Sequence, residues 1–401
     1  MNSRETVLAA LNHRETDKIP IDFGGTSTSS IHVISYLNLL KYLNMAHLEV
    51  KMFDPMMQLA MVNDEVKDYF KVDTEKLYRP TPKFGIAIYN GWKKYQESNG
   101  ISYLVPADYS PLDAGDYFEI RNNGILIAKR PKNALYFDNY FHPYSDHENP
   151  GDLDSVKLTN YSTQEVDFIS ESLGSLYGKT SRAIIFSIKG SFLETPCDLR
   201  GYNKFFMDLA LNKKYSEKLL DILLENYIAS FEKISEIIKG KVDVIKLTDD
   251  FGANNGMLIS PKTYRDIIKP RQKILFDTIK KNSNIKILLH SCGSIREILP
   301  DLIEIGLDAI NPIQANTSGM NPEILKKEFG KDIAFWGGTI IPQELMDLDN
   351  TGITSLLLER IEKLRKGGGF VYSFTHNFQP DIDSEKIELF FKIPGNFSKR
   401  G

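Results

Sequence analysis

Histidine, cysteine and carboxylate residues follow several apolar runs in the second half of the chain. In His290-Ser291-Cys292, two side chains at positions i and i+2 beyond a predicted strand can reach one metal ion, and imidazole with thiolate suits a metal of soft to borderline preference. Taken alone, this spacing is explained equally well by a polar loop that contains a small buried cysteine. His376 follows a later apolar run and offers a third ligand. These three residues predict a metal site.

Two adjacent carboxylates, Asp249 and Asp250, follow the apolar run that ends at Thr248. They have two interpretations, a structural cap on the following turn or an acid and base pair, and two carboxylates this close do not both titrate normally. Asp250 is assigned to the site because it lies further out on the loop. Glu194, a few residues beyond another predicted strand, has the same ambiguity and is the second catalytic candidate.

Two further groups of residues follow predicted strands. Asn311 and Gln314 carry amides that can orient a ligand, and Gly337 with Gly338 would allow a ligand to approach the backbone closely. We predict a substrate-binding role for these four. Gly367 to Gly369 precede a strand, where ending a helix is the simpler role.

The segments that position these residues alternate between short β-branched runs and longer amphipathic stretches. This order is typical of βα units and a parallel sheet, whose polar site residues gather at the carboxyl ends of the strands. Leu219, Leu223 and Tyr227, for example, recur at helical spacing within Ser216 to Ile238. The predicted strands are Ala183 to Ser187, Val242 to Leu247, Ile285 to Leu289, Ala309 to Asn311, Ile333 to Trp336 and Phe370 to Phe374.

The first half of the chain is less regular. Ile19 to Phe23 is the predicted first barrel strand, and Ile86 to Tyr89 and Ile125 to Ala128 are predicted as further strands. Tyr117 to Lys129 contains Asn-Asn-Gly at its middle and predicts a β-hairpin. We expect a single domain over residues 1–401: a distorted (β/α)8 barrel of the TIM type, with this hairpin inserted in the N-terminal half over the barrel mouth.

Composition limits the class of partner. The formal net charge of −4 provides no basic field for nucleic acid or an anionic membrane surface. With two cysteines, Cys197 and Cys292, a disulfide framework is not expected and a reducing compartment is. No apolar stretch reaches the length of a membrane span, so a cytoplasmic location is expected.

Several segments together resemble the uroporphyrinogen decarboxylase superfamily, in particular its methyltransferase-like branch. The resemblance covers almost the whole chain. It is carried by Ser3 to His13, Ile19 to Thr26, Leu199 to Tyr202, Asp249 to Gly252, Ile259 to Pro261, His290 to Ser294, Ile305 to Gln314, Trp336 to Gly338 and His376 to Asp381.

The resemblance implies a distorted (β/α)8 barrel. In corrinoid-linked methyltransferases of this branch, zinc is held by an H-x-C pair and a later cysteine. The pair matches His290 and Cys292, whereas the later position is His376. A histidine in place of a thiolate leaves more positive charge on the zinc unit and would make it a stronger Lewis acid.

The implied activity is methyl transfer between a small methylated substrate, or a thiol, and a corrinoid protein. No corrinoid-binding domain is visible, so a separate corrinoid protein is the expected partner, and a homodimer is possible. Asp250 or Glu194 would be a fourth ligand or a proton-transfer group. The alternatives are a metal-free decarboxylase, whose arginine-rich N-terminal segment is not seen at Lys18 to Gly25, and a non-catalytic barrel that binds a ligand or corrinoid.

Overall fold

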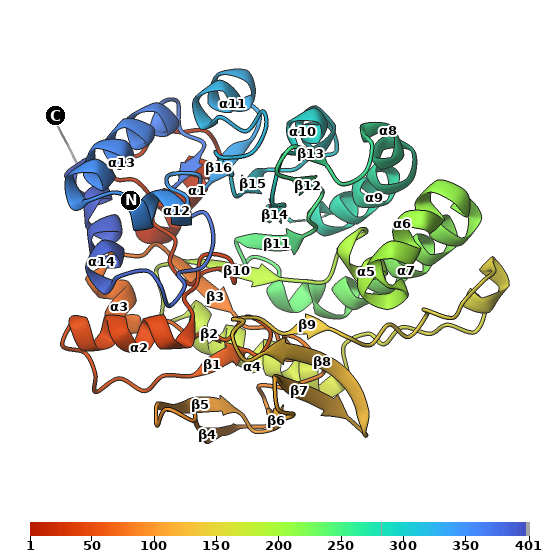
Figure 1. Cartoon of the computed structure of the whole chain (residues 1–401). Coiled ribbons are helices and arrows are strands. Elements are labelled where there is room, and N and C mark those ends of the chain that lie inside the picture. The colour runs from red at the N-terminus through yellow and green to blue at the C-terminus, as the bar shows by residue number, and fades with distance from the viewer. Residues whose placement is uncertain (282, 398–401) are drawn as a thin grey trace.

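The computed structural model describes residues 1–281 and 283–397, and within them a curled parallel sheet forms the centre of the molecule (Figure 1). The sheet has seven strands in the order β17-β16-β15-β14-β11-β10-β3. All of its neighbouring strands run parallel. The strands are β3 Thr74–Leu77, β10 Ala183–Ser187, β11 Val244–Thr248, β14 Lys286–His290, β15 Ala309–Asn311, β16 Ala334–Trp336 and β17 Phe370–Val371.

The gap between the two edge strands, β17 and β3, is filled by the segment around Ile21. Ile21 forms a parallel bridge with Tyr372, and its carbonyl accepts a hydrogen bond of 2.8 Å from the Asp73 amide. This contact is a single bridge rather than a strand ladder, so the sheet does not close completely. The chain therefore forms a distorted α/β barrel of the expected TIM type, with Ile21 in the place of the first strand.

Helices surround the sheet in Figure 1 and cover the apolar outward residues of its strands. The longest, α7, buries Leu219, Leu223 and Tyr227 along one stripe, as their spacing predicted. The helices are α1 Ser3–Leu11, α2 Val33–Tyr42, α3 Asp64–Tyr69, α4 Thr163–Tyr177, α5 Glu194–Arg200, α6 Tyr202–Leu211, α7 Lys213–Ile238, α8 Pro261–Thr263, α9 Lys269–Lys280, α10 Leu299–Glu304, α11 Pro322–Phe329, α12 Pro342–Asp347, α13 Asn350–Arg365 and α14 Ser384–Lys392.

The amino-terminal end of the barrel is filled by α1. Asn2 and Glu5 form a capping box that begins this helix. Its residues Val7, Ala10 and Leu11 form one buried cluster with inward residues of the strands, among them Ala183, Ile185, Val244, Leu288, Ala309, Ala334, Trp336 and Val371. The barrel interior is thus closed by apolar packing at the end opposite the predicted site.

The expected insertion lies in the N-terminal half, beside the barrel in Figure 1. Its hairpin pairs β7 Tyr117–Asn122 with β8 Ile125–Pro131, which confirms the predicted turn at Asn122 to Gly124. Just beyond β8, the Tyr136 hydroxyl donates a hydrogen bond of 2.8 Å to Asn377, next to His376. The other short strands here are β4 Trp92–Gln96, β5 Ser102–Pro106, β6 Leu112–Asp113 and β9 Asp138–Asn139, and β1 Met52–Asp54 pairs with β2 Leu59–Ala60.

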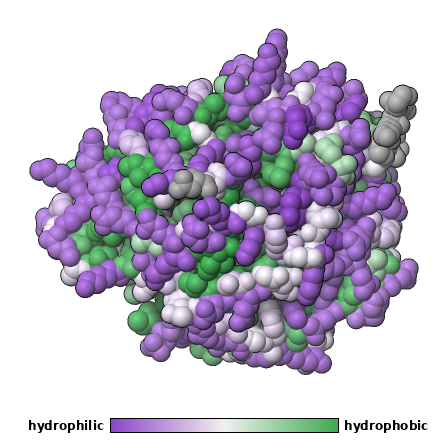
Figure 2. All heavy atoms as spheres, turned by 180° about the vertical axis from the view of Figure 1, so that it is seen from behind, coloured by the Kyte–Doolittle hydropathy of each residue, from purple (hydrophilic) through white to green (hydrophobic). Residues whose placement is uncertain are grey.

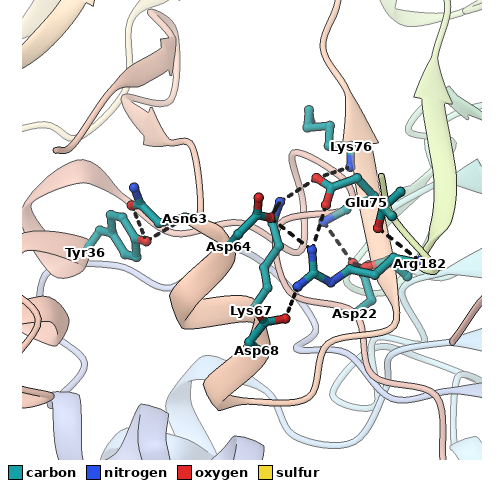
Figure 3. A network of polar contacts seen from close by, with 12 residues as sticks. Asp22, Tyr36, Asn63, Asp64, Lys67, Asp68, Glu75, Lys76 and Arg182 are labelled. Atoms are coloured by element: carbon teal, nitrogen blue, oxygen red, sulfur yellow. Dashed lines mark hydrogen bonds and ion pairs between the residues drawn. The ribbon is translucent and has the colours of Figure 1, made fainter. Parts of the chain in front are cut away.

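One strand expected in the first half is absent from the described residues, and another strand was missed. Ile86 to Tyr89 is a buried apolar run in a loop instead of a strand, and β3, the true second strand of the barrel, was not expected. The reason is that β3 carries Glu75 and Lys76 in place of an apolar run. Glu75 is buried because it forms ion pairs with Lys67 and with Arg182, whose Nη1 lies 3.1 Å from Glu75 Oε2 (Figure 3).

Figure 2 shows the rear face, where hydrophilic residues predominate and apolar residues form patches between them. Within residues 1–281 and 283–397, no helix combines the length and the apolar character needed to cross a bilayer.

Candidate functional site

Every predicted site residue lies at or just beyond the carboxyl end of a barrel strand. His290 is the last residue of β14, Asn311 the last of β15, and Cys292 and Asp250 stand in the loops after β14 and β11. Inward and outward side chains alternate along each strand, and His290 falls on the inward face two residues after Leu288. The strand pattern therefore directs these side chains to one end of the barrel.

Three potential metal ligands come together there. The ligand atoms of Asp250, His290 and Cys292 all lie within 4.8 Å of one another. His290 Nε2 is 3.4 Å from Cys292 Sγ and 3.7 Å from Asp250 Oδ1. Imidazole, thiolate and carboxylate are all ligands that zinc accepts, so this donor set fits the expected metal.

The orientation of His290 is set by Asn311. The Asn311 amide nitrogen donates to the Trp336 carbonyl at 2.8 Å, so its oxygen faces His290 Nδ1, 2.7 Å away. An amide oxygen only accepts, and therefore Nδ1 carries the proton while Nε2 keeps a free lone pair. Burial, followed by the charge of Lys246, lowers the pKa of His290 well below its usual value and keeps the ring neutral.

The loops that carry Asp250 and Cys292 are fixed to each other by backbone contacts. The Cys292 amide donates to Asp250 Oδ1 at 2.8 Å, and the Gly252 amide donates to the Cys292 carbonyl at 3.2 Å. Gly252 and Gly293 touch so closely that a Cβ on Gly293, whose φ is +79°, would lie 2.3 Å from the Gly252 carbonyl carbon. Only glycine fits at this crossing.

The two adjacent carboxylates divide their roles. Asp249 is fully buried and accepts hydrogen bonds from the Ser191 hydroxyl and from the amides of Phe192, Leu193 and Glu194, which lie at the start of α5. Asp249 is therefore structural, but it caps the start of α5 and not the turn that follows it in sequence, as had been expected. Asp250 instead faces His290 and Cys292.

Three acidic groups of the site have raised pKa values, which disfavours their ionised forms. Burial, then the charges of Asp250 and Asp249, raises the pKa of Glu194 to about 8. Burial and the neighbouring carboxylates raise the pKa of the Cys292 thiol, and burial raises that of Asp250. A divalent cation at this place would offset that excess of acidic groups, which is a second reason why the residues fit a metal.

His376 follows β17 and is not part of the three-residue group. It lies within electrostatic range of Asp250 and His290, and burial lowers its pKa. Its assignment as the third zinc ligand stays a prediction. In the described geometry, the third potential ligand beside His290 and Cys292 is Asp250.

The four predicted ligand-binding residues support the loops of the site. Gln314 accepts a hydrogen bond of 2.9 Å from the Gly293 amide, and a Cβ on Gly337 would lie 3.4 Å from the Asn311 amide nitrogen. Gly338 packs on Ile313, where a Cβ would come within 2.6 Å. These contacts explain the residue types by packing, and a role in binding substrate stays a prediction for all four.

Sequence reasoning missed two buried lysines, Lys76 on β3 and Lys246 on β11. Both take inward positions, and Lys246 lies within electrostatic range of Asp250, Glu194 and Cys292. The signal that could have found Lys246 is a single charge at an inward position of the apolar run Val244–Thr248.

The fold and the site together define a barrel enzyme class with a candidate metal centre at the strand ends. The sequence profile of the family described as uroporphyrinogen decarboxylase (URO-D) matches residues 133–395. The chain belongs to this family, which confirms the resemblance of its motifs.

A solved structure gives a likeness in fold. A methyltransferase from Methanosarcina mazei aligns over 100% of both chains with a TM-score of 0.63 and 17% sequence identity. A B12-independent methionine synthase from Shewanella sp. W3-18-1, in complex with selenomethionine, aligns over 60% of this chain and 68% of its own, with a TM-score of 0.36 and 12% identity. No curated protein matches the sequence significantly.

Proposed function

We propose that this protein is a zinc-dependent methyltransferase that moves a methyl group between a small methylated substrate, or a thiol, and a corrinoid protein. The observation that carries the proposal is the convergence of Asp250, His290 and Cys292 within 4.8 Å at the barrel mouth. Membership of the URO-D family and the likeness in fold to the Methanosarcina mazei methyltransferase support it.

His290 Nε2, Cys292 Sγ and Asp250 Oδ1 would hold the metal, with His376 as the alternative third ligand. When bound, zinc would supply Lewis acidity that stabilises a thiolate or the negative charge that develops on the atom losing its methyl group. Asn311 keeps His290 in the tautomer that leaves Nε2 free.

Glu194 would serve as the proton-transfer group. Its pKa of about 8 keeps it protonated at neutral pH, so it can give its proton to the donor atom that the methyl group leaves. The methyl group passes to the acceptor, the donor atom keeps the bonding electron pair, and the proton of Glu194 neutralises that atom. For a thiol acceptor, the thiol proton would pass to the ionised form of Glu194, which the same pKa makes the major form only above pH 8.

The test measures the zinc content of the purified wild type and of two variants, in each of which one of the two cysteines is replaced. Cys292→Ser is expected to lose the one zinc ion per chain that the wild type holds. Cys197→Ser changes a buried cysteine of α5 and is expected to keep it. Zinc-loaded protein is then expected to transfer methyl groups to a free reduced corrinoid, followed by its visible spectrum. Absence of zinc from the wild type and from Cys197→Ser would contradict the proposal.

Two more variants distinguish the third ligand. Asp250→Ala is expected to weaken zinc binding strongly, and His376→Ala to weaken it only slightly, if Asp250 completes the set. The reverse order would assign the third place to His376.

A further inference from the structure

Two lysines point into the barrel from strands on either side of β10. Lys76 and Lys246 are only 4% and 3% exposed. Lys76 is level with Ile185 of β10, and Lys246 is level with Ser187, so they occupy neighbouring layers of the interior. Their neighbours Glu75 and Ile245 point outward.

Neither lysine is neutralised by a carboxylate. Lys76 Nζ donates to the Ser27 hydroxyl at 3.0 Å and stands 4.6 Å from the ring centroid of Phe53. Among the described residues, Lys246 Nζ has no hydrogen-bond or ion-pair partner, although Asp250 and Glu194 attract it from a greater distance.

Among the described residues, two of the other buried cations are paired with carboxylates, whereas Arg130 donates to the Ala134 carbonyl and lies over the rings of Phe118 and Phe137. Lys67 is paired with Glu75, and Arg200 Nε lies 2.8 Å from Asp208 Oδ2. A buried ammonium without a partner costs free energy of folding, and burial lowers the pKa of Lys246 to about 8 and that of Lys76 to about 7. Their positions are therefore explained by a ligand rather than by folding.

We propose that Lys246 and Lys76 bind the anionic group of the substrate, so that the transferred methyl group or the thiol belongs to a short organic acid. This inference rests on the proposed function. Lys246 is level with Leu288, and His290 lies two residues closer to the mouth, which is roughly 7 Å along the strand. A carboxylate or sulfonate on Lys246 would thus place a reacting atom a few bonds away beside Cys292.

The charges of the site permit an anion at this depth. A divalent metal balances the Cys292 thiolate and the Asp250 carboxylate, and Glu194 is protonated at neutral pH. The positive charge of Lys246, whose pKa is about 8, is then not offset, and Lys76, whose pKa is about 7, is about half protonated at neutral pH. Two cations suit one anionic group and not the several carboxylates of a porphyrinogen.

The test compares two thiols that differ in charge alone, 3-mercaptopropionate and 3-mercaptopropionamide, by calorimetric titration of the zinc-loaded protein. The acid is expected to bind about 10- to 100-fold more tightly than the amide, as for a charge-assisted hydrogen bond. In Lys246→Met the acid is expected to lose this advantage while the affinity for the amide is unchanged. Lys246→Arg, which keeps the charge, is expected to retain a preference for the acid.

Stability and a surface control exclude a general effect. Lys246→Met is expected to melt at or above the wild-type temperature, because it removes an unpaired buried charge. Lys262→Met, at a position whose side chain is 83% exposed, is expected to keep the full preference for the acid. Equal binding of acid and amide by the wild type, or a preference that survives in both Lys246→Met and Lys76→Met, would overturn the inference.

The same comparison with propionate and propionamide on metal-free protein separates this inference from the proposed function. A preference for propionate that depends on Lys246, in a protein that transfers no methyl group, would uphold the anion site and reject the methyltransferase. Methyl transfer without any preference for propionate would uphold the methyltransferase and reject the anion site.

Discussion

At the scale of single residues, Asn311 joins three segments of the barrel mouth. Its oxygen receives hydrogen bonds from His290 and from Thr28, whose hydroxyl lies 3.0 Å away, and its nitrogen donates to the Trp336 carbonyl. Losing the partner of a metal-binding histidine typically weakens the metal about 10- to 100-fold. We therefore expect Asn311→Ala to bind zinc that much more weakly, measured by competition with a chromophoric chelator.

Thr28→Val is the control for this prediction. It removes one hydrogen bond to Asn311 and leaves the bond to His290, so zinc affinity is expected to change little. A loss as large as that of Asn311→Ala would show that the loop, and not the histidine tautomer, governs the metal.

Replacing Asp249 is predicted to lower stability, whereas replacing its neighbour Asp250 is predicted to lower zinc binding. Asp249→Ala removes the buried acceptor for three amides at the start of α5 and is expected to lower the free energy of unfolding by at least about 2 kcal/mol. Asp250→Ala is expected to lose zinc with a much smaller loss of stability. Urea unfolding of both metal-free variants, beside their zinc content, measures the contrast.

Glu194 is predicted to make the stability of the metal-free protein depend on pH. Its pKa is raised from 4.5 to about 8 on folding, so its neutral form stabilises the protein fully below pH 4.5. This contribution is lost as the pH rises through 8. The difference in unfolding free energy between wild type and Glu194→Gln is therefore expected to shift in favour of the variant from acid to alkaline pH. A difference that is flat from pH 4.5 to 8 would contradict the burial of this carboxyl.

The site residues differ in how visible they are in the sequence. His290 and Cys292 were predicted as ligands because His376 offers a third ligand and the segment resembles a family with a zinc-binding H-x-C pair, whereas the H-x-C spacing alone is weak evidence. Asp250 was expected near the metal, but its place beside His290 depends on the contact between Gly252 and Gly293, which is set by packing between two loops. Lys246 was not predicted because one charge in an apolar run has no meaning until its direction is known.

At the scale of elements, the crossing of the loops after β11 and β14 positions the candidate metal ligands. Gly293→Ala would bring a Cβ to 2.3 Å from Gly252 and impose a side chain at positive φ. We expect it to lower the unfolding free energy by about 1–3 kcal/mol and to weaken zinc binding. Gly256→Ala, on β13 Gly256–Met257, meets nothing within 4 Å and is expected to alter neither quantity. Thermal unfolding and zinc titration of both variants are the measurements.

The barrel strands also differ in how far the sequence predicts them. Ala183–Ser187 and Ala309–Asn311 match the predicted bounds because both of their faces are covered, so their residues are apolar or end in a site residue. β3 was not predicted because it carries the charged residue Glu75, which is buried only through its ion pairs with Lys67 and Arg182 (Figure 3). Arg182, just before β10, is 107 residues away from Glu75, and Lys67 of α3 meets Glu75 only once the helix packs beside the strand, so local patterns do not reveal either ion pair.

At the scale of the whole molecule, α1 is part of the barrel core. Leu11→Ala would leave a cavity at the floor of the barrel and is expected to cost about 2–5 kcal/mol of unfolding free energy. Leu8→Ala makes the same change at a partly exposed position of the same helix, outside that cluster, and is expected to cost clearly less. Equal losses in denaturant unfolding would show that α1 is an appendage and not the floor.

The filled floor also bears on the order of events in the proposed reaction. Because Val7, Ala10 and Leu11 close one end of the barrel, a small molecule would enter and leave on the side of Cys292. A corrinoid protein that docked there for methyl exchange would cover the same opening. We therefore expect the small molecule to bind before its large partner and to leave after it, so that the kinetics would follow a compulsory order and slow undocking would limit product release.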